Sequence, residues 1–438
     1  HNLGEALVKQ GQLDEAIASY RRAIELNPTS AWSHYNLGEV LVKQGQVEEA
    51  LILFRQAIEL NPNLVLAYRN LPANHSLLYQ LGCIFLQQGQ TNEAVTCFLR
   101  AIQIKPDFTK SYLSLRYMLP LNRLDEAIAC YRKAIELQPD FAWADICLGY
   151  ALTRQGKHDE AIRCFQSASY KQTRISYPSL AEKQSNSNLI SKPNFIICGV
   201  AKCGTTSLSK YIFEHPHVIP AIQKEIHFFS YEYSQGLDWY LAQFPSIPEG
   251  ESFLTGEASP TYLTYIGAEK RIFDHFPKVK LICLLRNPVD RTISEYYHRR
   301  QEGTENRSVE KAILSEIEAL KGIEDSPVMD TEIAINRQEI RYLKHSMYFY
   351  FIKKWMERFS SEQLLIVKSE DFYANTALIM QQVFDFLEIP SYQAAEYKKY
   401  MVGSYKPISD NLRRQISEFF LPHNQKLENY LGRKFKWK

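Results

Sequence analysis

The sequence predicts an all-α superhelix followed by an α/β domain with a parallel sheet. In the first 170 residues a nearly identical stretch recurs after 34 residues, which is typical of stacked helical repeats. A polar segment without that period follows, and beyond it short β-branched runs alternate with helical patterns. Such alternation indicates βαβ units, in which strands pair in parallel. A chain of 438 residues is also too long for one ordinary core.

The helical repeats are clearest in two long copies. NLGEALVKQGQLDEAIASYRRAIELNP begins at Asn2, and NLGEVLVKQGQVEEALILFRQAIELNP begins at Asn36. The intervals between the equivalent alanines imply an insertion of about ten residues around RNLPANHSLL and a deletion near Pro120. Proline ends each second helix because it cannot continue one. The alanines are Ala16, Ala50, Ala94, Ala127 and Ala161, and the prolines are Pro28, Pro62, Pro106 and Pro139.

This pattern resembles the tetratricopeptide repeat. The resemblance implies about five units stacked into a superhelix, whose concave groove holds a protein partner. A passive spacer or an oligomerisation arm is the alternative. In some relatives a ladder of asparagines in the groove clamps a peptide backbone. Asn2 and Asn36 match that ladder, but Gln80 and Cys147 replace its later members, so we do not expect such a clamp.

The loss of the period and the change of composition set the expected boundaries. We expect repeats over 1–167, a linker rich in Ser, Asn and Lys over 168–192, and the α/β domain over 193–438. The expected buried strands are Phe195–Val200, Lys280–Leu285 and Leu364–Val367.

Composition argues against several classes of protein. With 45% hydrophobic residues and a net charge of +2, neither a disordered chain nor a nucleic-acid-binding surface is expected. The eight cysteines form no CxxC pair, so we predict no metal site and no disulfide framework. We therefore expect the protein to be located in a reducing cytoplasm. The sequence contains no run of about 18 apolar residues, so we expect no membrane span. Because His1 falls inside a repeat, we expect an upstream part.

The segment GVAKCGTTSL, residues 199–208, follows the first predicted strand and precedes a helical pattern. A glycine-rich turn at this position directs backbone N–H groups and the positive end of a helix at an anion. Four residues separate Gly199 from Gly204, as in an ATP-binding P-loop, but Thr205 stands where that loop has its lysine. Lys202 lies inside the loop instead. A structural turn, a kinase-like loop and a loop for a metal-free phosphorylated donor all remain open from these residues.

This loop resembles the 5′-phosphosulfate loop of sulfotransferases, whose donor is 3′-phosphoadenosine 5′-phosphosulfate. The resemblance implies that Lys202 stabilises charge on the bridging oxygen, and that no metal is needed. It also implies a set of donor-binding residues in the loop. They are Lys202, Cys203, Gly204, Thr205, Thr206 and Ser207.

A second segment, VKLICLLRNPVDRTISEYYH, places Arg286 at the carboxyl end of a predicted strand and Ser294 eight residues later on a helix. Ligands of open α/β sheets collect at that end of the strands, and arginine suits bidentate phosphate contact. Taken alone, an Arg-Asn-Pro turn is more often a salt-bridged loop. The segment resembles the 3′-phosphate site of the same family, which implies that Arg286 and Ser294 hold that phosphate.

The segment KEIHFFSYEY, which begins at Lys224, is similar to heparan sulfate sulfotransferases, and the similarity extends over 193–438. It implies that Glu225 is the base that takes the acceptor's proton, a role for which we expect a raised pKa. His227 either orients Glu225 or the acceptor, or is simply a packed histidine. Three further residues are expected near the nucleotide by the same resemblance. They are Gly403, Tyr405 and Lys406.

The sequence departs from the heparan O-sulfotransferases at three positions. Thr206 replaces an arginine, Ser230 an acidic residue and Ala258 a lysine. Since those residues serve an acidic polysaccharide and the transferring group, a heparan-like acceptor is in doubt. The aromatic clusters of HFFSYEY and MYFYF are expected to be mostly core, although some rings could stack on a sugar or on adenine.

We therefore expect a bacterial, cytoplasmic sulfotransferase that acts on a carbohydrate hydroxyl or amine, or on a protein tyrosine. The repeats would recruit the acceptor or a protein partner. Two alternatives remain: an ATP-dependent small-molecule kinase, and a tetratricopeptide adaptor whose second domain has lost catalysis. The kinase requires a lysine after Gly204, which the chain lacks.

Overall fold

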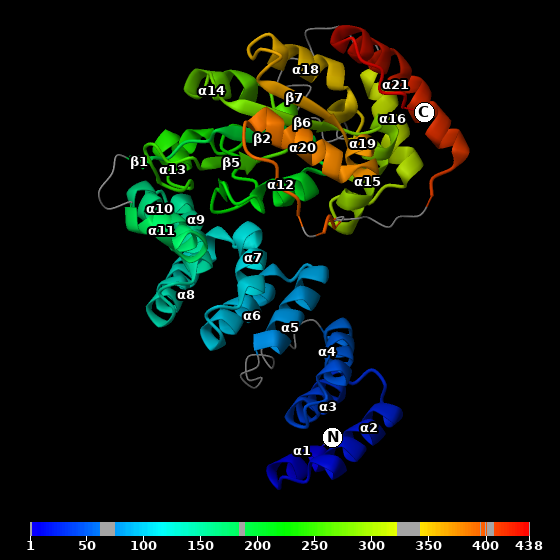
Figure 1. Cartoon of the computed structure of the whole chain (residues 1–438). Coiled ribbons are helices and arrows are strands. Elements are labelled where there is room, and N and C mark those ends of the chain that lie inside the picture. The colour runs from blue at the N-terminus through cyan, green and yellow to red at the C-terminus, as the bar shows by residue number, and fades with distance from the viewer. Residues whose placement is uncertain are drawn as a thin grey trace. The chain divides into compact units, whose positions relative to one another are not determined.

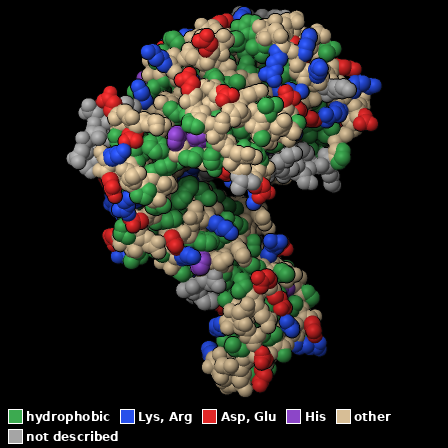
Figure 2. Space-filling model, viewed as in Figure 1, with side chains coloured by type: hydrophobic (Ala, Val, Ile, Leu, Met, Phe, Trp, Pro, Cys, Tyr) green, Lys and Arg blue, Asp and Glu red, His purple; other side chains and the backbone are tan. Residues whose placement is uncertain are grey.

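The computed structural model describes residues 2–61, 75–183, 189–321, 342–394, 396–398, 400 and 407–437. The chain divides into two compact units, His1–Lys171 and Gln172–Lys438. Within the described ranges, no helix is long and apolar enough to cross a membrane. On the face seen in Figure 2, acidic and basic side chains are interspersed, in keeping with the net charge of +2.

The described residues of the first unit form helices joined by turns, as predicted (Figure 1). Successive helices pair through turns in which a glycine takes a left-handed conformation, such as Gly45 with φ 81° and Gly89 with φ 75°. Only glycine adopts this conformation without strain, which explains the recurring KQGQ-type turn. The helices are α1 (Asn2–Lys9), α2 (Leu13–Leu26), α3 (Ala31–Lys43), α4 (Val47–Leu60), α5 (His75–Gln87), α6 (Thr91–Ile104), α7 (Thr109–Met118), α8 (Leu124–Leu137), α9 (Ala142–Arg154) and α10 (His158–Ser176).

Small residues lie where paired helices meet, as the period predicts. The five recurring alanines are fully buried, since each has an exposed fraction of 0%. A Cβ placed on Gly38 of α3 would lie 2.8 Å from Cε1 of Phe54 on α4, so this helix pair is too close for a side chain there. The deletion predicted near Pro120 is a short connection, in which the 3₁₀ turn Leu121–Arg123 leads directly into α8.

The second unit contains a five-stranded parallel sheet in the order β3-β5-β2-β6-β7. The three predicted strands are confirmed as β2 (Phe195–Gly199), β6 (Lys280–Leu285) and β7 (Leu364–Lys368). Prediction missed β3 (Val218–Pro220), which is only three residues long and ends in proline, and β5 (Leu254–Ala258), which has Gly256 and Glu257 in place of a continuous apolar run. β2 lies between β5 and β6, with Phe195 opposite both Gly256 and Lys280.

Helices cover the sheet on both faces (Figure 1). Asn287 caps α15 by accepting a hydrogen bond from the Val289 N–H at 2.9 Å, and Pro288 occupies the first turn. The Asn-Pro pair that follows Arg286 thus begins a helix. The helices are α12 (Thr205–Phe213), α13 (Leu237–Leu241), α14 (Ala268–His275), α15 (Pro288–Gln301), α16 (Val309–Leu320), α18 (Tyr348–Met356), α19 (Ser369–Ala374), α20 (Thr376–Leu387) and α21 (Asp410–Leu431).

The predicted linker, 168–192, carries regular structure over its described residues. α10 continues to Ser176, α11 spans Pro178–Lys183, and β1 (Leu189–Ile190) pairs antiparallel with β4 (Ile247–Pro248). The Tyr177 hydroxyl donates to the Val218 carbonyl at 3.1 Å. From Gln172 onward these residues belong to the second unit, which their polar composition does not reveal.

Candidate active site

A pocket of about 850 Å³ lies in the second unit, where the loops after β2, β5, β6 and β7 converge. This is the carboxyl end of the parallel sheet, where ligands of α/β proteins bind. Its lining contains most of the residues predicted from the two phosphate motifs and from the KEIHFF segment. They are Lys202, Gly204, Thr205, Thr206, Glu225, His227, Arg286 and Ser294.

The loop after β2 requires unusual backbone conformations. Lys202 has φ 71° and Gly204 has φ 98°. A Cβ at position 204 would lie 2.7 Å from the Tyr373 hydroxyl, so only glycine fits there. Gly204 is also the N-cap of α12, and no side chain caps that helix. The positive end of α12 therefore faces the pocket, as anion binding requires.

Cys203 and Ser207 hold the loop rather than line the pocket. Both are buried, with exposed fractions of 0%. The Cys203 thiol lies 3.9 Å from the Tyr348 hydroxyl, and burial raises its pKa to about 11. The Ser207 hydroxyl accepts a hydrogen bond from the Tyr400 N–H at 3.2 Å. Gly403, Tyr405 and Lys406, also predicted to bind the nucleotide, lie outside the described residues.

Arg286 connects the two predicted phosphate motifs. Its Nη1 donates to the Lys202 carbonyl at 3.1 Å, and its own carbonyl accepts from the Tyr348 hydroxyl at 2.9 Å. Ser294 lies further along α15 and is 5% exposed. Lys202 and Arg286 are 84 residues apart in the sequence. The two motifs that contain them therefore line one cavity.

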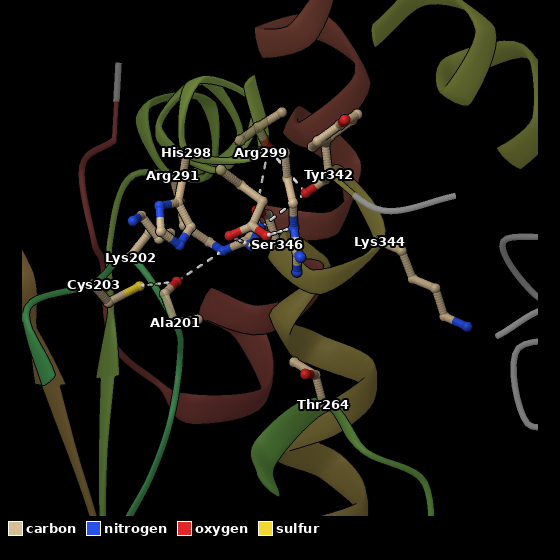
Figure 3. Close-up of polar contacts among 12 residues, drawn as sticks. Ala201, Lys202, Cys203, Thr264, Arg291, His298, Arg299, Tyr342, Lys344 and Ser346 are labelled. Carbon is tan, nitrogen blue, oxygen red and sulfur yellow. Dashed lines mark hydrogen bonds and ion pairs between the residues drawn. The ribbon is translucent and has the colours of Figure 1, made fainter. Parts of the chain in front are cut away.

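Arg291 is a buried anchor that the sequence analysis missed (Figure 3). Its Nε donates to the Ala201 carbonyl at 3.2 Å and its Nη1 to the Tyr342 carbonyl at 2.9 Å. Glu295, one turn later on α15, lies 3.6 Å from Nη2. Arg291 thus connects the loop after β2 to α15 from the buried side of the pocket wall. An arginine one residue after the acid in NPVDR gives no sequence signal that its side chain turns inward.

Glu225 and His227 form a strained, charged turn. Both have left-handed backbones, with φ 64° and 59°, and such strain is concentrated at functional sites. Glu225 Oε2 lies 3.5 Å from His227 Nε2, and Glu225 Oε1 accepts from Lys224 Nζ at 2.9 Å. Lys224 Nζ also donates to the Thr206 hydroxyl at 2.8 Å, so it bridges the loop and Glu225. The sequence pattern predicts no role for Lys224, because its contact with Thr206 exists only in the fold.

The expectation of a raised pKa for Glu225 is wrong. Partial burial raises the pKa of this carboxyl, but the His227 hydrogen bond and the Lys224 ammonium outweigh burial and lower the pKa to about 2. Opposite charges and hydrogen bonds to the ionised form both favour ionisation. Glu225 is therefore a carboxylate throughout the neutral range, as a proton acceptor must be, although its low pKa weakens it as a base.

A second carboxylate lies behind this turn. Glu257, at the end of β5, is 1% exposed and accepts hydrogen bonds from Ser259 at 2.6 Å and Tyr262 at 2.8 Å. Burial raises the pKa of Glu257. The Ser259 hydroxyl in turn accepts the His227 N–H at 3.1 Å, and the Glu225 N–H donates to the Ala258 carbonyl at 3.0 Å. The end of β5 thereby holds the backbone of both candidate residues.

Comparison with known families agrees with this geometry. The family model described as a sulfotransferase domain matches residues 192–428. The chain belongs to the sulfotransferase family. Tetratricopeptide models match 4–45 with 120–156, and 31–64 with 75–108, which confirms the repeats.

Several relatives resemble the sulfotransferase domain. A membrane-associated sulfotransferase of Dictyostelium discoideum is 26% identical over 57% of this chain and 67% of its own length. Mouse heparan sulfate glucosamine 3-O-sulfotransferase 3A1 is 29% identical over 56% of this chain and 64% of its own length. A crystal structure of a sulfotransferase from Alicyclobacillus acidocaldarius is 26% identical, covers 56% of this chain and 98% of that one, and has a TM-score of 0.46. The chain thus spans about two thirds or less of the two curated relatives.

The three departures within the sulfotransferase domain have structural roles. Thr206 receives the Lys224 hydrogen bond, and Ser230 donates to the His227 carbonyl at 3.1 Å. Ala258 is fully buried on β5.

Two of the four Phe and Tyr rings of HFFSYEY are core in the sulfotransferase domain, and Tyr233 is half-buried. Phe228 and Phe229 are 1% and 0% exposed, and both pack against Tyr240. Tyr231 differs, since it lines the pocket and is 65% exposed.

Proposed function

We propose that the sulfotransferase domain transfers a sulfuryl group from 3′-phosphoadenosine 5′-phosphosulfate to a hydroxyl or amine of an acceptor. The observation that carries this proposal is the single pocket shared by Lys202, Arg286 and Ser294, with Arg286 bonded to the loop that bears Lys202. A donor with a phosphosulfate at one end and a phosphate at the other needs two anion sites in one cavity.

The residues fit this donor. The glycine turn, the positive end of α12 and Lys202 would hold the phosphosulfate, while Arg286 and Ser294 would hold the 3′-phosphate. The donor supplies a sulfur–oxygen bond to phosphate, which breaks as sulfur bonds to the acceptor. Lys202 stabilises the charge that develops on the phosphate side, as a preorganised cation does for an oxyanion. Among the described residues, no group of His, Cys, Asp or Glu is arranged to hold a metal.

Glu225 would take the proton from the acceptor group. It lines the pocket, is partly exposed there and is ionised at neutral pH. His227 Nδ1 lies 3.1 Å from the Thr261 hydroxyl, and its Nε2 faces Glu225. The Thr261 contact therefore fixes the imidazole ring beside the carboxylate. This supports an orienting role for His227 rather than passive packing.

In this proposal a carbohydrate is the preferred acceptor, and a protein tyrosine is the second choice. One curated relative is named for the 3-O-sulfation of heparan sulfate glucosamine, but the departures at Thr206, Ser230 and Ala258 disfavour so acidic a polymer. The repeats would recruit the acceptor or a protein partner. All eight cysteines are free thiols, which supports a cytoplasmic location.

Thermal-shift titration with 3′-phosphoadenosine 5′-phosphate, against ATP with Mg²⁺, tests the donor. A ligand at one hundred times its dissociation constant stabilises a protein by about 2.7 kcal/mol. We expect a large shift with the bisphosphate and little with ATP. Stabilisation by ATP alone would instead favour a kinase. Bisphosphate binding without label transfer from the sulfated donor to any acceptor of a glycan and peptide panel would favour a non-catalytic domain.

A further inference from the structure

Beside the residues assigned to the donor, the pocket has a second region formed by Tyr231 and the C-terminal half of α15. The residues are His298 and Arg299 of α15 and Glu302, which caps the end of that helix. We propose that this region is the acceptor subsite and that it takes an uncharged sugar, which packs its ring on Tyr231. The inference rests on the proposed function and names its acceptor class.

Tyr231 offers an exposed aromatic surface beside the proposed base. Its ring lies 5.6 Å from the His227 ring at 61°, and 5.4 Å from the Tyr265 ring at 83°. These two near-perpendicular neighbours hold the ring in place, yet 65% of Tyr231 stays exposed. An exposed, rigid aromatic ring packs well against the C–H face of a sugar. His227 contacts Glu225, so a sugar on Tyr231 lies next to the proton acceptor.

The opposite wall of this region is charged, but its charges are paired. Arg299 Nε lies 3.0 Å from Glu295 Oε1, and its Nη1 lies 3.5 Å from Glu302 Oε2. His298 Nε2 lies 3.3 Å from Glu302 Oε1. Figure 3 shows His298 and Arg299 on α15 close to Arg291. Tyr231, Glu295 and Arg299 line the same pocket, so the charged residues and the ring border one space.

This pairing decides between acceptor classes. A polyanion entering the region meets the Glu302 carboxylate and finds Arg299 already bound by two carboxylates, so repulsion opposes it. Sugar hydroxyls need no net charge, because they donate to carboxylates and accept from guanidinium and imidazole groups. The region therefore favours a neutral glycan over a uronate-rich or sulfated chain.

Label transfer from the sulfated donor tests the inference on three acceptors: cellohexaose, a heparosan hexasaccharide and a tyrosine-containing acidic peptide. We expect transfer to cellohexaose with the highest kcat/KM. Tyr231→Ala should raise KM for that sugar about tenfold with kcat within a factor of two, since aromatic packing contributes to binding before and during transfer. Tyr231→Phe should keep the wild-type KM. Tyr430→Ala, which removes an exposed tyrosine outside the pocket lining, is the matched control.

Glu302→Lys tests the charge argument, because it removes the carboxylate and adds a cation. We expect this variant to gain activity on the heparosan hexasaccharide at least fivefold while transfer to cellohexaose changes little. A wild-type preference for heparosan or for the peptide would overturn the inference, as would an unchanged KM in Tyr231→Ala. Thermal shift with 3′-phosphoadenosine 5′-phosphate separates the two failures. If the bisphosphate binds, only the acceptor class is wrong; if it does not bind, the proposed function fails.

Discussion

The two units of this chain differ in what their glycines and left-handed residues do: in the repeats they allow helices to pack closely, and in the sulfotransferase domain they shape the loop after β2. In the repeats, Gly149 lets α9 approach α10, since a Cβ there would lie 2.5 Å from Cε1 of Phe165. The same contact recurs in other repeats, between Gly38 and Phe54 for example. In the sulfotransferase domain, Gly204 shapes one anion loop, and Lys202 adopts a left-handed backbone that a non-glycine residue rarely takes.

The difference shows how each unit tolerates change. A repeat spreads its stability over similar neighbouring contacts, so one substitution weakens one contact of a series. The pocket of the sulfotransferase domain concentrates strained and charged residues in a few turns, so we expect one substitution there to remove a function while the fold remains. Four substitutions test this contrast, from the largest expected effect to the smallest.

Glu225→Gln should lower kcat by about 10³-fold, within the range of general-base catalysis, because an amide cannot accept the proton. Binding of 3′-phosphoadenosine 5′-phosphate should persist, since the proposed donor contacts do not involve Glu225. Steady-state kinetics and thermal shift measure the two effects. A kcat within tenfold of wild type would show that another group is the base.

Arg286→Ala should weaken bisphosphate binding by about one hundredfold, because charge-assisted hydrogen bonds contribute up to about 3 kcal/mol. Isothermal titration calorimetry measures the dissociation constant. The matched control is Arg414→Ala, which removes an exposed arginine of α21 that lies outside the pocket lining. Equal affinities of the two variants would remove Arg286 from the donor site.

Gly149→Ala should destabilise the repeats by about 1–3 kcal/mol, the usual cost of overpacking a buried contact. Phe165 is 0% exposed, so its ring has little room to move. Urea unfolding followed by circular dichroism measures the loss, and the thermal shift with bisphosphate should be unchanged. A loss of bisphosphate binding would mean that the contrast between the two units is wrong.

Lys224→Met should have the smallest effect of the four, a change in how stability and kcat/KM depend on pH in the acid range. The wild-type Glu225 pKa is about 2, below its ordinary value, and removal of the ammonium raises it. In the wild type, Glu225 contributes stability above its ordinary pKa, and this contribution disappears as the pH falls towards 2. The variant should lose less stability in that range, and its kcat/KM should begin to fall at a higher pH.

Acid titrations of unfolding, together with pH profiles of kcat/KM, measure both consequences of Lys224→Met. Lys354→Met provides a control on α18, outside the pocket lining. Superimposable profiles for wild type and Lys224→Met would show that Lys224 does not influence Glu225.

Much of the fold was predictable from local patterns. The 34-residue period placed the helix pairs and their buried alanines, and β-branched runs marked β2, β6 and β7. β3 escaped because it is only three residues long, and β5 because Gly256 and Glu257 interrupt its apolar pattern. The polar composition of 168–192 predicts a linker, whereas Tyr177 of this segment makes a hydrogen bond to Val218 that only the fold brings about.

The sequence by itself determined which residue types stand in the anion loop, at Arg286 and Ser294, and at Glu225. Each lies next to its strand or turn, so its position follows from local order. Only the tertiary structure decided that these segments share one pocket, that Arg291 ties them from behind, and that Lys224 and His227 lower the Glu225 pKa rather than burial raising it. Electrostatic and packing effects depend on distances in space. For residues far apart in the chain, the order of the sequence does not reveal those distances.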